Sequence, residues 1–283
     1  MDGKKVKLRL EHISQSYIVK NEVSDAVVDV SLDVYDNEFL VILGPGRCGK
    51  TVLLNMIAGL EKPVDGSLFL DGEEIHGSDE RIGMVFQKLA LMPWKTVMEN
   101  VEFGLKMKGV PKAQRRETAQ KYINLVGLQG FEKSYPSQLS GGMKQKLALA
   151  TALATEAKVL ILDEPFANLD PGSCADLSAK LAQLNRQGLT LFIVDHRPDY
   201  WLPFLSRILL MDKTGALLPE SVLPKELQAH RELFRERGLF VDDSWLEGQT
   251  PMPLPQPEEF MVEAKDLRLL QGKTTVAEHL SFA

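Results

Sequence analysis

The sequence has few cysteines and no excess of basic residues, and each shortage excludes a class of protein. Its 283 residues include two cysteines, Cys48 and Cys174, which give no disulfide framework and are typical of a cytosolic protein. The formal net charge of −6 argues against a general nucleic-acid binder, because no basic excess is present to neutralise phosphates. We therefore expect no nucleic-acid partner.

Long apolar runs are also missing. Residues 1–10 carry no apolar core of the kind that a secretory signal needs. The longest apolar stretch, residues 147–162, is interrupted by polar and charged residues, so no segment is predicted to cross a bilayer. If the protein works at a membrane, another chain must supply the span.

A phosphate-binding loop is the clearest motif that is present. Residues 39–43 form an apolar strand, a Gly-Pro-Gly turn follows, and the pattern G-x-x-x-x-G-K-[ST] is completed by Gly44, Gly49, Lys50 and Thr51. Glycines let backbone N–H groups converge on phosphate oxygens, and the helix N-terminus behind them adds a partial positive charge. In this pattern Lys50 reaches the β- and γ-phosphates and the Thr51 hydroxyl holds Mg²⁺. The predicted nucleotide-binding residues of the loop are Gly44, Pro45, Gly46, Arg47, Cys48, Gly49, Lys50, Thr51 and Val52.

Two carboxylates form a second site that supports the first. The apolar strand over residues 159–162 ends on Asp163 and Glu164, and ligands bind at the carboxyl ends of strands in open α/β sheets. Phosphoryl transfer needs a carboxylate for the Mg²⁺ shell and a polar group that orients the attacking water, so we assign Asp163 to the metal and Glu164 to the water. His196 follows the strand over 190–194 in the same way, which favours a γ-phosphate contact over a surface histidine.

The order of the predicted elements indicates an α/β fold. Residues 7–13 and 26–34 alternate as half-buried strands, and the polar stretch 14–25 between them is predicted to be a hairpin connection. Tyr17 lies near the start of that connection, where its ring could stack on a purine; packing is the alternative interpretation. Residues 96–127 show helical spacing, whereas the later strands alternate with helices, which is typical of a mainly parallel sheet.

Three further motifs follow in order along the chain. Gln87 ends the apolar run 81–87, the segment Leu139-Ser140-Gly141-Gly142-Met143-Lys144-Gln145 opens a helix, and residues 167–170 follow the two carboxylates. With these motifs the chain resembles the nucleotide-binding subunit of an ATP-binding cassette (ABC) transporter over about residues 7–218. The resemblance implies a P-loop NTPase sheet (residues 1–220) with an N-terminal antiparallel β-subdomain and a helical subdomain insert over about 90–157.

The resemblance also implies a role for each motif. Gln87 would be the Q-loop, and His196 would be the switch histidine. ATP bound at 44–51 of one subunit would be sandwiched by the signature residues Ser140, Gly141 and Gly142 of another. The implied catalytic residues are Glu164, His196, Gln87 and Lys50, and the implied Mg²⁺ ligands are Thr51, Gln87 and Asp163.

Partners and location follow from the same resemblance. It implies a homodimer or a paired ABC ATPase subunit, integral-membrane permease subunits, a substrate-binding protein as a further candidate, and a peripheral position on the cytoplasmic face of the membrane. Residues 85–110 are similar to the ATPases of nitrate, sulfonate and taurine importers, whereas residues 147–171 are closer to energy-coupling-factor and cobalt-type importers. Two alternatives stay open: a soluble cassette protein acting on ribosomes or repair complexes, and an ATP-binding partner with little hydrolysis. The second is motivated by Arg47 and Val52, which stand where the family usually has Gly and a hydroxyl.

The C-terminal part departs from the pattern. Residues 221–260 are predicted to form a charged helix, over 223–238, and a Pro-rich linker. Residues 261–283 repeat the character of residues 8–13 and 27–34, so we expect the start of a second, truncated cassette. A strand pair added to the first domain, or a disordered end, is the alternative.

Overall fold

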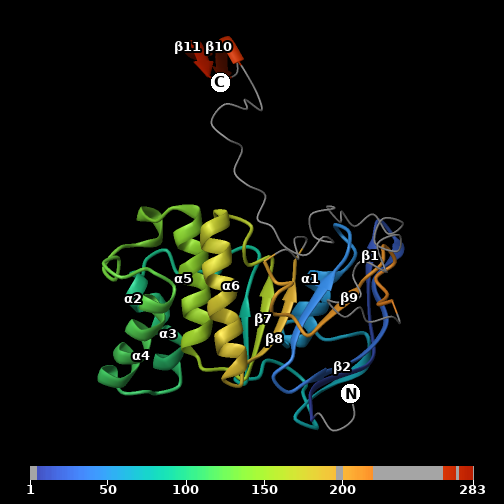
Figure 1. Cartoon of the computed structure of the whole chain (residues 1–283). Helices are drawn as coiled ribbons and strands as arrows, with labels where there is room; N and C mark the ends of the chain where they lie inside the picture. The colour runs from blue at the N-terminus through green and yellow to red at the C-terminus, as the bar shows by residue number, and fades with distance from the viewer. Residues whose placement is uncertain (1–4, 196–199, 219–263, 272–273, 283) are drawn as a thin grey trace. The chain divides into compact units, whose positions relative to one another are not determined.

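The computed structural model describes residues 5–195, 200–218, 264–271 and 274–282. The chain divides into two compact units, Met1–Val241 and Asp242–Ala283, which are described separately. Figure 1 shows the elements of both units coloured along the chain.

A five-stranded parallel sheet forms the centre of the first unit. Its strands, in spatial order, are β6 (Ile82–Val85), β7 (Val159–Asp163), β8 (Thr190–Val194), β3 (Phe39–Leu43) and β9 (Arg207–Leu210). Every residue of β3, β7 and β8 is buried, which explains why these strands are continuous apolar runs rather than alternating ones. The predicted parallel α/β sheet is confirmed, and its carboxyl ends meet along one edge.

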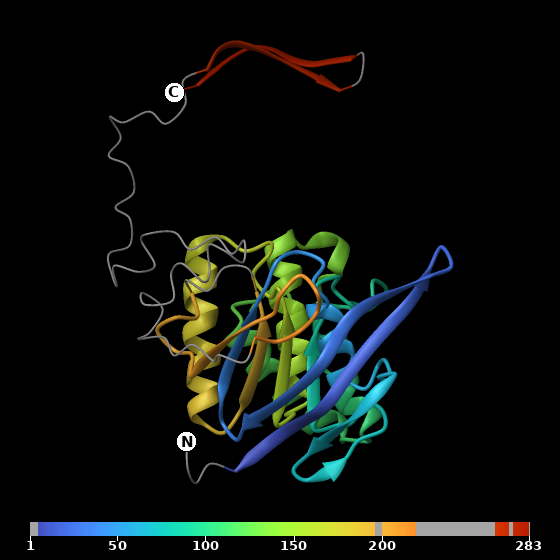
Figure 2. The same ribbon diagram turned by 90° about the vertical axis from the view of Figure 1, so that its right-hand side faces the viewer.

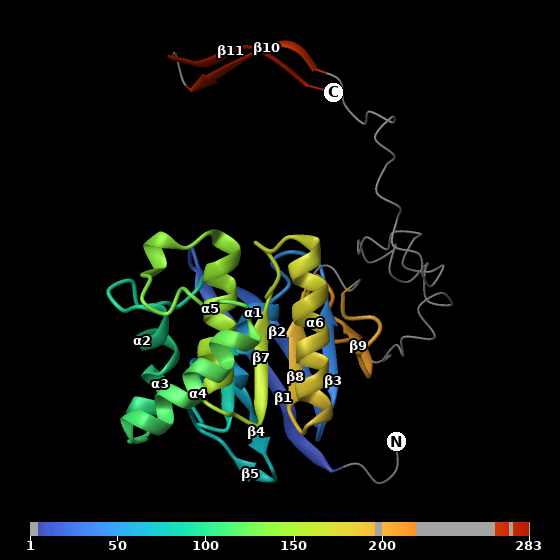
Figure 3. The same ribbon diagram turned by 60° about the vertical axis from the view of Figure 1, so that its left-hand side comes forward.

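Helices cover both faces of this sheet. On one face lie α5 (Gly141–Ala154) and α6 (Pro171–Arg186), in front of the strands in Figure 3. On the other face, α1 (Lys50–Ile57) buries Leu53, Leu54, Met56 and Ile57 in a core shared by the parallel sheet and the N-terminal sheet. Gly59, at φ +68°, follows the end of α1, in the left-handed conformation that commonly ends a helix.

An antiparallel sheet makes up the N-terminal part of the unit. Its order is β2 (Glu22–Tyr35), β1 (Val6–Val19), β4 (Asp65–Leu70) and β5 (Glu73–Glu74). The prediction that residues 14–25 are a hairpin connection is wrong, because β1 and β2 stay paired as far as Val19 and Glu22 and form the long hairpin seen in Figure 2. The two-residue turn at Lys20 and Asn21, with φ of 53° and 67°, has the positive φ angles that close a tight hairpin. Cross-strand pairing therefore extends through a stretch whose polar composition suggested a loop.

Residues 97–138 form a mostly helical region that packs on α5. It contains α2 (Val97–Val101), α3 (Phe103–Met107), α4 (Lys112–Leu125) and the short 3-10 helix η1 (Pro136–Gln138). α2 begins with a capping box, in which Thr96 and Glu99 satisfy each other's backbone N–H groups. The helical spacing predicted over 96–127 is confirmed, and the chain breaks between α3 and α4 at Gly109, which has φ +75°.

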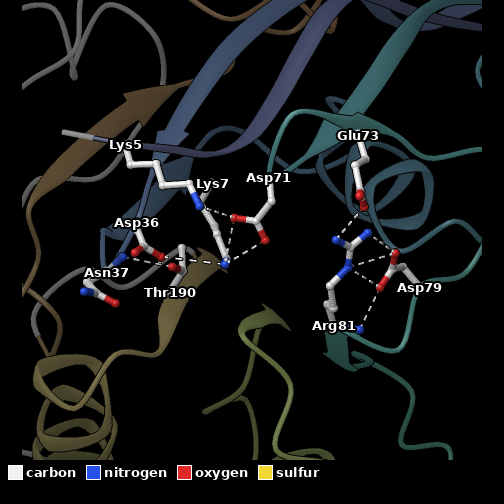
Figure 4. Close-up of polar contacts among 9 residues, drawn as sticks. All are labelled: Lys5, Lys7, Asp36, Asn37, Asp71, Glu73, Asp79, Arg81 and Thr190. Atoms are coloured by element: carbon white, nitrogen blue, oxygen red, sulfur yellow. Dashed lines mark hydrogen bonds and ion pairs between the residues drawn. The ribbon is translucent and has the colours of Figure 1, made fainter. Parts of the chain in front are cut away.

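Polar contacts tie the antiparallel sheet to the start of β8 (Figure 4). The Nζ atom of the largely buried Lys7 lies 2.9 Å from an oxygen of Asp71 and 3.8 Å from one of Asp36. The backbone N–H of Asn37, the residue after Asp36, donates to the Thr190 hydroxyl at 3.0 Å. These contacts lie at the amino end of β8, so they hold the two sheets together at the edge opposite the phosphate-binding loop.

In the second unit, the described residues form an antiparallel strand pair, β10 (Ala264–Gln271) and β11 (Thr274–Phe282). The predicted helix over 223–238 and the Pro-rich linker lie outside the described residues. Within the described residues, no helix combines the length and the apolar character needed to span a bilayer.

Candidate functional site

The loop between β3 and α1 is shaped by close backbone approaches. A Cβ atom on Gly49, which has φ +95° and caps α1, would lie 1.9 Å from the carbonyl oxygen of Ala26 in β2. A Cβ atom on Gly44 would lie 2.7 Å from the carbonyl oxygen of Met211, directly after β9. Both positions therefore require glycine, and the loop is held between β2 and the end of β9.

Lys50 lies inside this loop and is only 6% exposed. Its Nζ atom donates to the carbonyl oxygens of Gly44 at 2.7 Å and Pro45 at 2.8 Å, and it lies 3.5 Å from Cys48 Sγ. The ammonium is thus centred in the loop, where an incoming phosphate would compete with two neutral carbonyls for it. The Cys48 side chain belongs to the buried apolar core, which agrees with a small packing residue in a tight turn.

Thr51 and Asp163 come together at the carboxyl edge of the sheet. The Thr51 hydroxyl, in the first turn of α1, donates to Asp163 Oδ2 at 3.0 Å, and Asp163, the last residue of β7, is 1% exposed. Mg²⁺ prefers oxygen ligands and commonly takes one or two from the protein, with water and phosphate oxygens completing its shell. A hydroxyl and a carboxylate in contact beside a phosphate loop therefore fit this ion.

Gln87 and Glu164 form a second contact at the same edge. Gln87 Nε2, in the loop after β6, donates to Glu164 Oε2 at 2.8 Å. Glu164 has φ +47°, in the left-handed region that non-glycine residues rarely occupy, and its N–H donates to the Val194 carbonyl at 2.9 Å. A strained backbone fixed by a neighbouring strand is common at functional sites. Two of the predicted metal ligands, Thr51 and Asp163, are in contact, whereas the third, Gln87, contacts Glu164.

The two unusual residues of the loop have different environments. Arg47 has φ +64°, so the strain expected of arginine at a glycine position is present. Its side chain is exposed and forms no ion pair within the described part of the chain. Val52 packs against the apolar core, so its side chain contributes to packing at the position where the family usually has a hydroxyl.

Tyr17 is held by an acidic residue. It lies in β1 opposite Ser24 of β2, and its hydroxyl donates to the Glu61 carboxylate. Partial burial and the bond to Glu61 raise the pKa of Tyr17 to about 12, so it stays protonated at neutral pH. Tyr17 is 38% exposed, and the predicted purine stacking stays a prediction.

The signature residues begin α5. The Ser140 hydroxyl accepts from the Met143 N–H at 3.2 Å and caps the helix, and Ser140 and Gly141 are exposed. A Cβ atom on Gly142 would lie 3.1 Å from the carbonyl oxygen of Asn168. The signature therefore packs on the loop after β7 and leaves its first N–H groups open to a partner.

His196 lies outside the described residues, so its γ-phosphate role stays a prediction. On one side of it, Asp195 accepts from the indole N–H of Trp201 at 3.0 Å, and both side chains are buried. Sequence reasoning missed Trp201. The available signal was an aromatic pair, Tyr200 and Trp201, soon after the histidine.

Comparisons with known proteins agree with a nucleotide-binding site of this kind. A family model described as ABC transporter matches residues 27–167. An uncharacterized ABC transporter ATP-binding protein of Methanocaldococcus jannaschii is 42% identical over 222 residues, covering 78% of this chain and 83% of that protein. A taurine import ATP-binding protein of Roseobacter denitrificans is 36% identical over 251 residues, covering 84% of this chain and 94% of that protein.

Solved structures show the same fold. A dimeric bacterial ABC transporter cassette superimposes with a TM-score of 0.72 at 30% identity, covering 77% of this chain and 98% of the other. The same cassette bound to ADP and phosphate, in a post-hydrolysis state, matches equally well. These relatives are named as ATP-binding proteins of transporters or import systems, which favours transport over action on ribosomes or repair complexes. The chain belongs to the ABC transporter family as an ATP-binding, ATP-hydrolysing subunit.

Proposed function

We propose that this chain powers solute import through separate integral-membrane permease subunits, as one half of a pair that sandwiches ATP. Relatives named for the import of taurine, sulfate or thiosulfate, and spermidine or putrescine support import. This chain spans 73%, 60% and 52% of those proteins' lengths, respectively. We assign the choice of solute to the partner chains. A substrate-binding protein is a further candidate partner.

The single observation that carries the proposal is the grouping of functional side chains at one edge of the sheet. Lys50 would bind the β- and γ-phosphates once they displace its two carbonyl partners. Thr51 and Asp163, already in contact, would hold Mg²⁺, which when bound neutralises the charge that develops on the phosphates. These groups bind and orient the triphosphate before any bond breaks.

Glu164 would act on the attacking water. Its carboxylate would orient the water and accept a proton from it as the oxygen attacks the γ-phosphorus. Gln87, bonded to Glu164 at 2.8 Å, would hold that carboxylate and take part in the Mg²⁺ and water network. His196 would contact the γ-phosphate and stabilise the charge of the transition state.

The paired subunit would supply the opposite side of the site. Ser140 and Gly141 are exposed at the start of α5, and open helix N-terminal N–H groups bind anions. The solved cassette of the same fold is dimeric. We propose a head-to-tail homodimer, or a pair with a related subunit, in which these groups bind the γ-phosphate held by the partner's phosphate loop.

The permease contact is proposed for the loop after β6. Phe86, Ala90 and Leu91 line a cavity of about 310 Å³ together with residues of β6 and α5 and with Lys108. Trp94, three residues after Leu91, is 73% exposed. An apolar recess and an exposed tryptophan in the same loop are suited to a partner helix. Binding there would place the protein on the cytoplasmic face of the membrane.

Domain boundaries belong to the same proposal. We assign residues 1–220 to the nucleotide-binding domain, about 90–157 to its helical subdomain, and 221–260 to a helix and linker. Residues 261–283 would start a second cassette. The pairing of β10 with β11 supports the last assignment, since β1 and β2 open the first domain with an antiparallel pair.

The test is Glu164→Gln, with Lys50→Ala as a binding-deficient comparison. Loss of the base should lower phosphate release by about 100-fold or more while ATP stays bound. Gel filtration should then show an ATP-dependent dimer for Glu164→Gln and none for Lys50→Ala. A monomer in both cases would contradict the sandwich. For the transport role, co-purification with a membrane subunit is expected, whereas co-sedimentation with ribosomes from a detergent-free lysate would contradict it.

A further inference from the structure

A fully buried tryptophan, Trp201, lies between β3 and the loop that follows β7. The indole of Trp201 stacks on the ring of Phe166, with centroids 4.2 Å apart and an interplanar angle of 15°. It meets the ring of Phe39 edge-on, at 5.8 Å and 61°. Phe166 lies two residues after Glu164, and Phe39 begins the strand that leads to the phosphate loop. The indole thus contacts two of the elements on which the site is built.

The same indole also makes a directed polar contact. Its Nε1–H donates to Asp195 Oδ2 at 3.0 Å, and Asp195 is 4% exposed. A buried carboxylate is costly without hydrogen bonds, and a bond to a charged acceptor is stronger than one between neutral groups. Because Asp195 directly follows Val194, whose carbonyl accepts from the Glu164 N–H, the contact ties Trp201 to the end of β8 beside Glu164.

The loop after β7, which contains Phe166, makes further backbone contacts. The Leu169 N–H donates to the Phe166 carbonyl at 3.2 Å, and the neighbouring Asn168 carbonyl packs on Gly142 of the signature. The N–H of Glu164, at the start of that loop, donates to Val194 of β8. Movement of Phe166 would therefore reach both Glu164 and the signature.

We propose that Trp201 is a positioning residue for ATP hydrolysis, which holds the segment bearing Glu164 through Phe166 and through Asp195 at the end of β8. This inference rests on the proposed role of Glu164. An aliphatic side chain could fill the same volume, but it could neither stack on Phe166 nor donate to Asp195. A displacement of about 1 Å in a catalytic group can cost a factor of about 100 in rate, so a loss of this anchor should appear in kcat.

The test is steady-state phosphate release by Trp201→Phe, which keeps an aromatic ring and removes the N–H donor. We expect kcat to fall about tenfold or more, with KM for ATP within about twofold of wild type. Ile123→Val, a buried change in α4, serves as the control for a small loss of stability and should leave both constants unchanged. An unchanged kcat in Trp201→Phe, or a parallel loss of ATP binding, would show a packing role and overturn the inference.

A second pair of variants keeps the test decisive if Trp201→Phe does not fold. Asp195→Asn retains a carbonyl oxygen that can accept from the indole N–H, whereas Asp195→Leu has no acceptor. The asparagine variant should keep most of the wild-type kcat and the leucine variant should lose it; equal loss in both would refute positioning through this bond. Wild type and Lys50→Ala are measured alongside. Equal rates in those two would contradict the proposed catalytic site itself, which separates its failure from that of the inference.

Discussion

Arg47 occupies a backbone conformation that glycine adopts without strain, so Arg47→Gly should raise the free energy of unfolding of the nucleotide-free protein. The residue has φ +64°, and its exposed side chain has no ion pair among the described residues. A left-handed conformation costs an L-residue about 1–2 kcal/mol. Glycine loses more backbone freedom on folding, which offsets about 0.5–1 kcal/mol of the gain. Taken near the middle of both ranges, these values leave a net stabilisation of about 0.5–1 kcal/mol.

The expected change in Tm follows from domain size. For a domain of about 150–250 residues, 1 kcal/mol shifts Tm by about 2–4 °C, so Arg47→Gly should raise Tm by roughly 1–4 °C. Glu156→Gly is the matched control, because Glu156 is exposed and has φ +55° directly after α5, away from the phosphate loop. Thermal unfolding without nucleotide should show a similar rise in both variants.

Binding of ATP should separate the two variants. If the Arg47 guanidinium bonds a phosphate, its loss removes a charge-assisted hydrogen bond of about 1.5–3 kcal/mol, which weakens ATP binding roughly tenfold or more. Glu156→Gly should bind ATP like wild type. A Tm for Arg47→Gly at or below that of wild type, with a rise for Glu156→Gly, would refute the strain argument. Unchanged ATP affinity would remove Arg47 from the nucleotide-binding residues.

Three further changes have defined outcomes. Thr51→Val deletes the hydroxyl at nearly constant volume and should raise the Mg²⁺ concentration for half-maximal phosphate release by about tenfold or more; an unchanged Mg²⁺ dependence would exclude Thr51 as a ligand. Arg207→Met leaves the carboxylate of Glu38, 2.8 Å away and 3% exposed, buried without its cation, and should cost about 3–5 kcal/mol in urea unfolding. A loss below about 1 kcal/mol would contradict that estimate. Hydrogen bonds from Arg81 hold the pKa of Asp79 below its usual range (Figure 4), so this carboxylate stabilises the fold above its unfolded pKa and the gain is lost as pH falls through the lower folded value. Arg81→Gln should therefore flatten the acid decline of the urea midpoint below about pH 4, and an unaltered decline would count against it.

Local features of the fold could be predicted because they depend on neighbouring residues. The buried strands at 39–43, 159–162 and 190–194 are continuous apolar runs, and such runs are typical of parallel strands covered on both faces. The glycine pattern from Gly44 to Thr51 specified a phosphate loop because its conformation is set by residues adjacent in the chain. The hairpin was predicted too short, since polar residues at 14–25 can pair across strands when a tight turn allows it.

Contacts between distant segments were decided only by the tertiary structure. Thr51 and Asp163 are 112 positions apart, and Gln87 and Glu164 are 77 apart. Sequence motifs supplied the residue types for both pairs and predicted that they would share a site. Which side chains meet depends on the strand order β6-β7-β8-β3-β9 and on the packing of α1 against that sheet.

Trp201 likewise separates what the sequence predicts from what the tertiary structure decides. Its sequence position indicated only an aromatic residue near a predicted catalytic histidine. Stacking on Phe166 and bonding to Asp195 required β7 and β8 to lie side by side, which is a property of the whole sheet. The sequence alone thus determined the family, the phosphate loop and the identity of the reactive groups, because these follow from local patterns. The tertiary structure determined how those groups are paired and held, because pairing depends on packing between segments far apart in the chain.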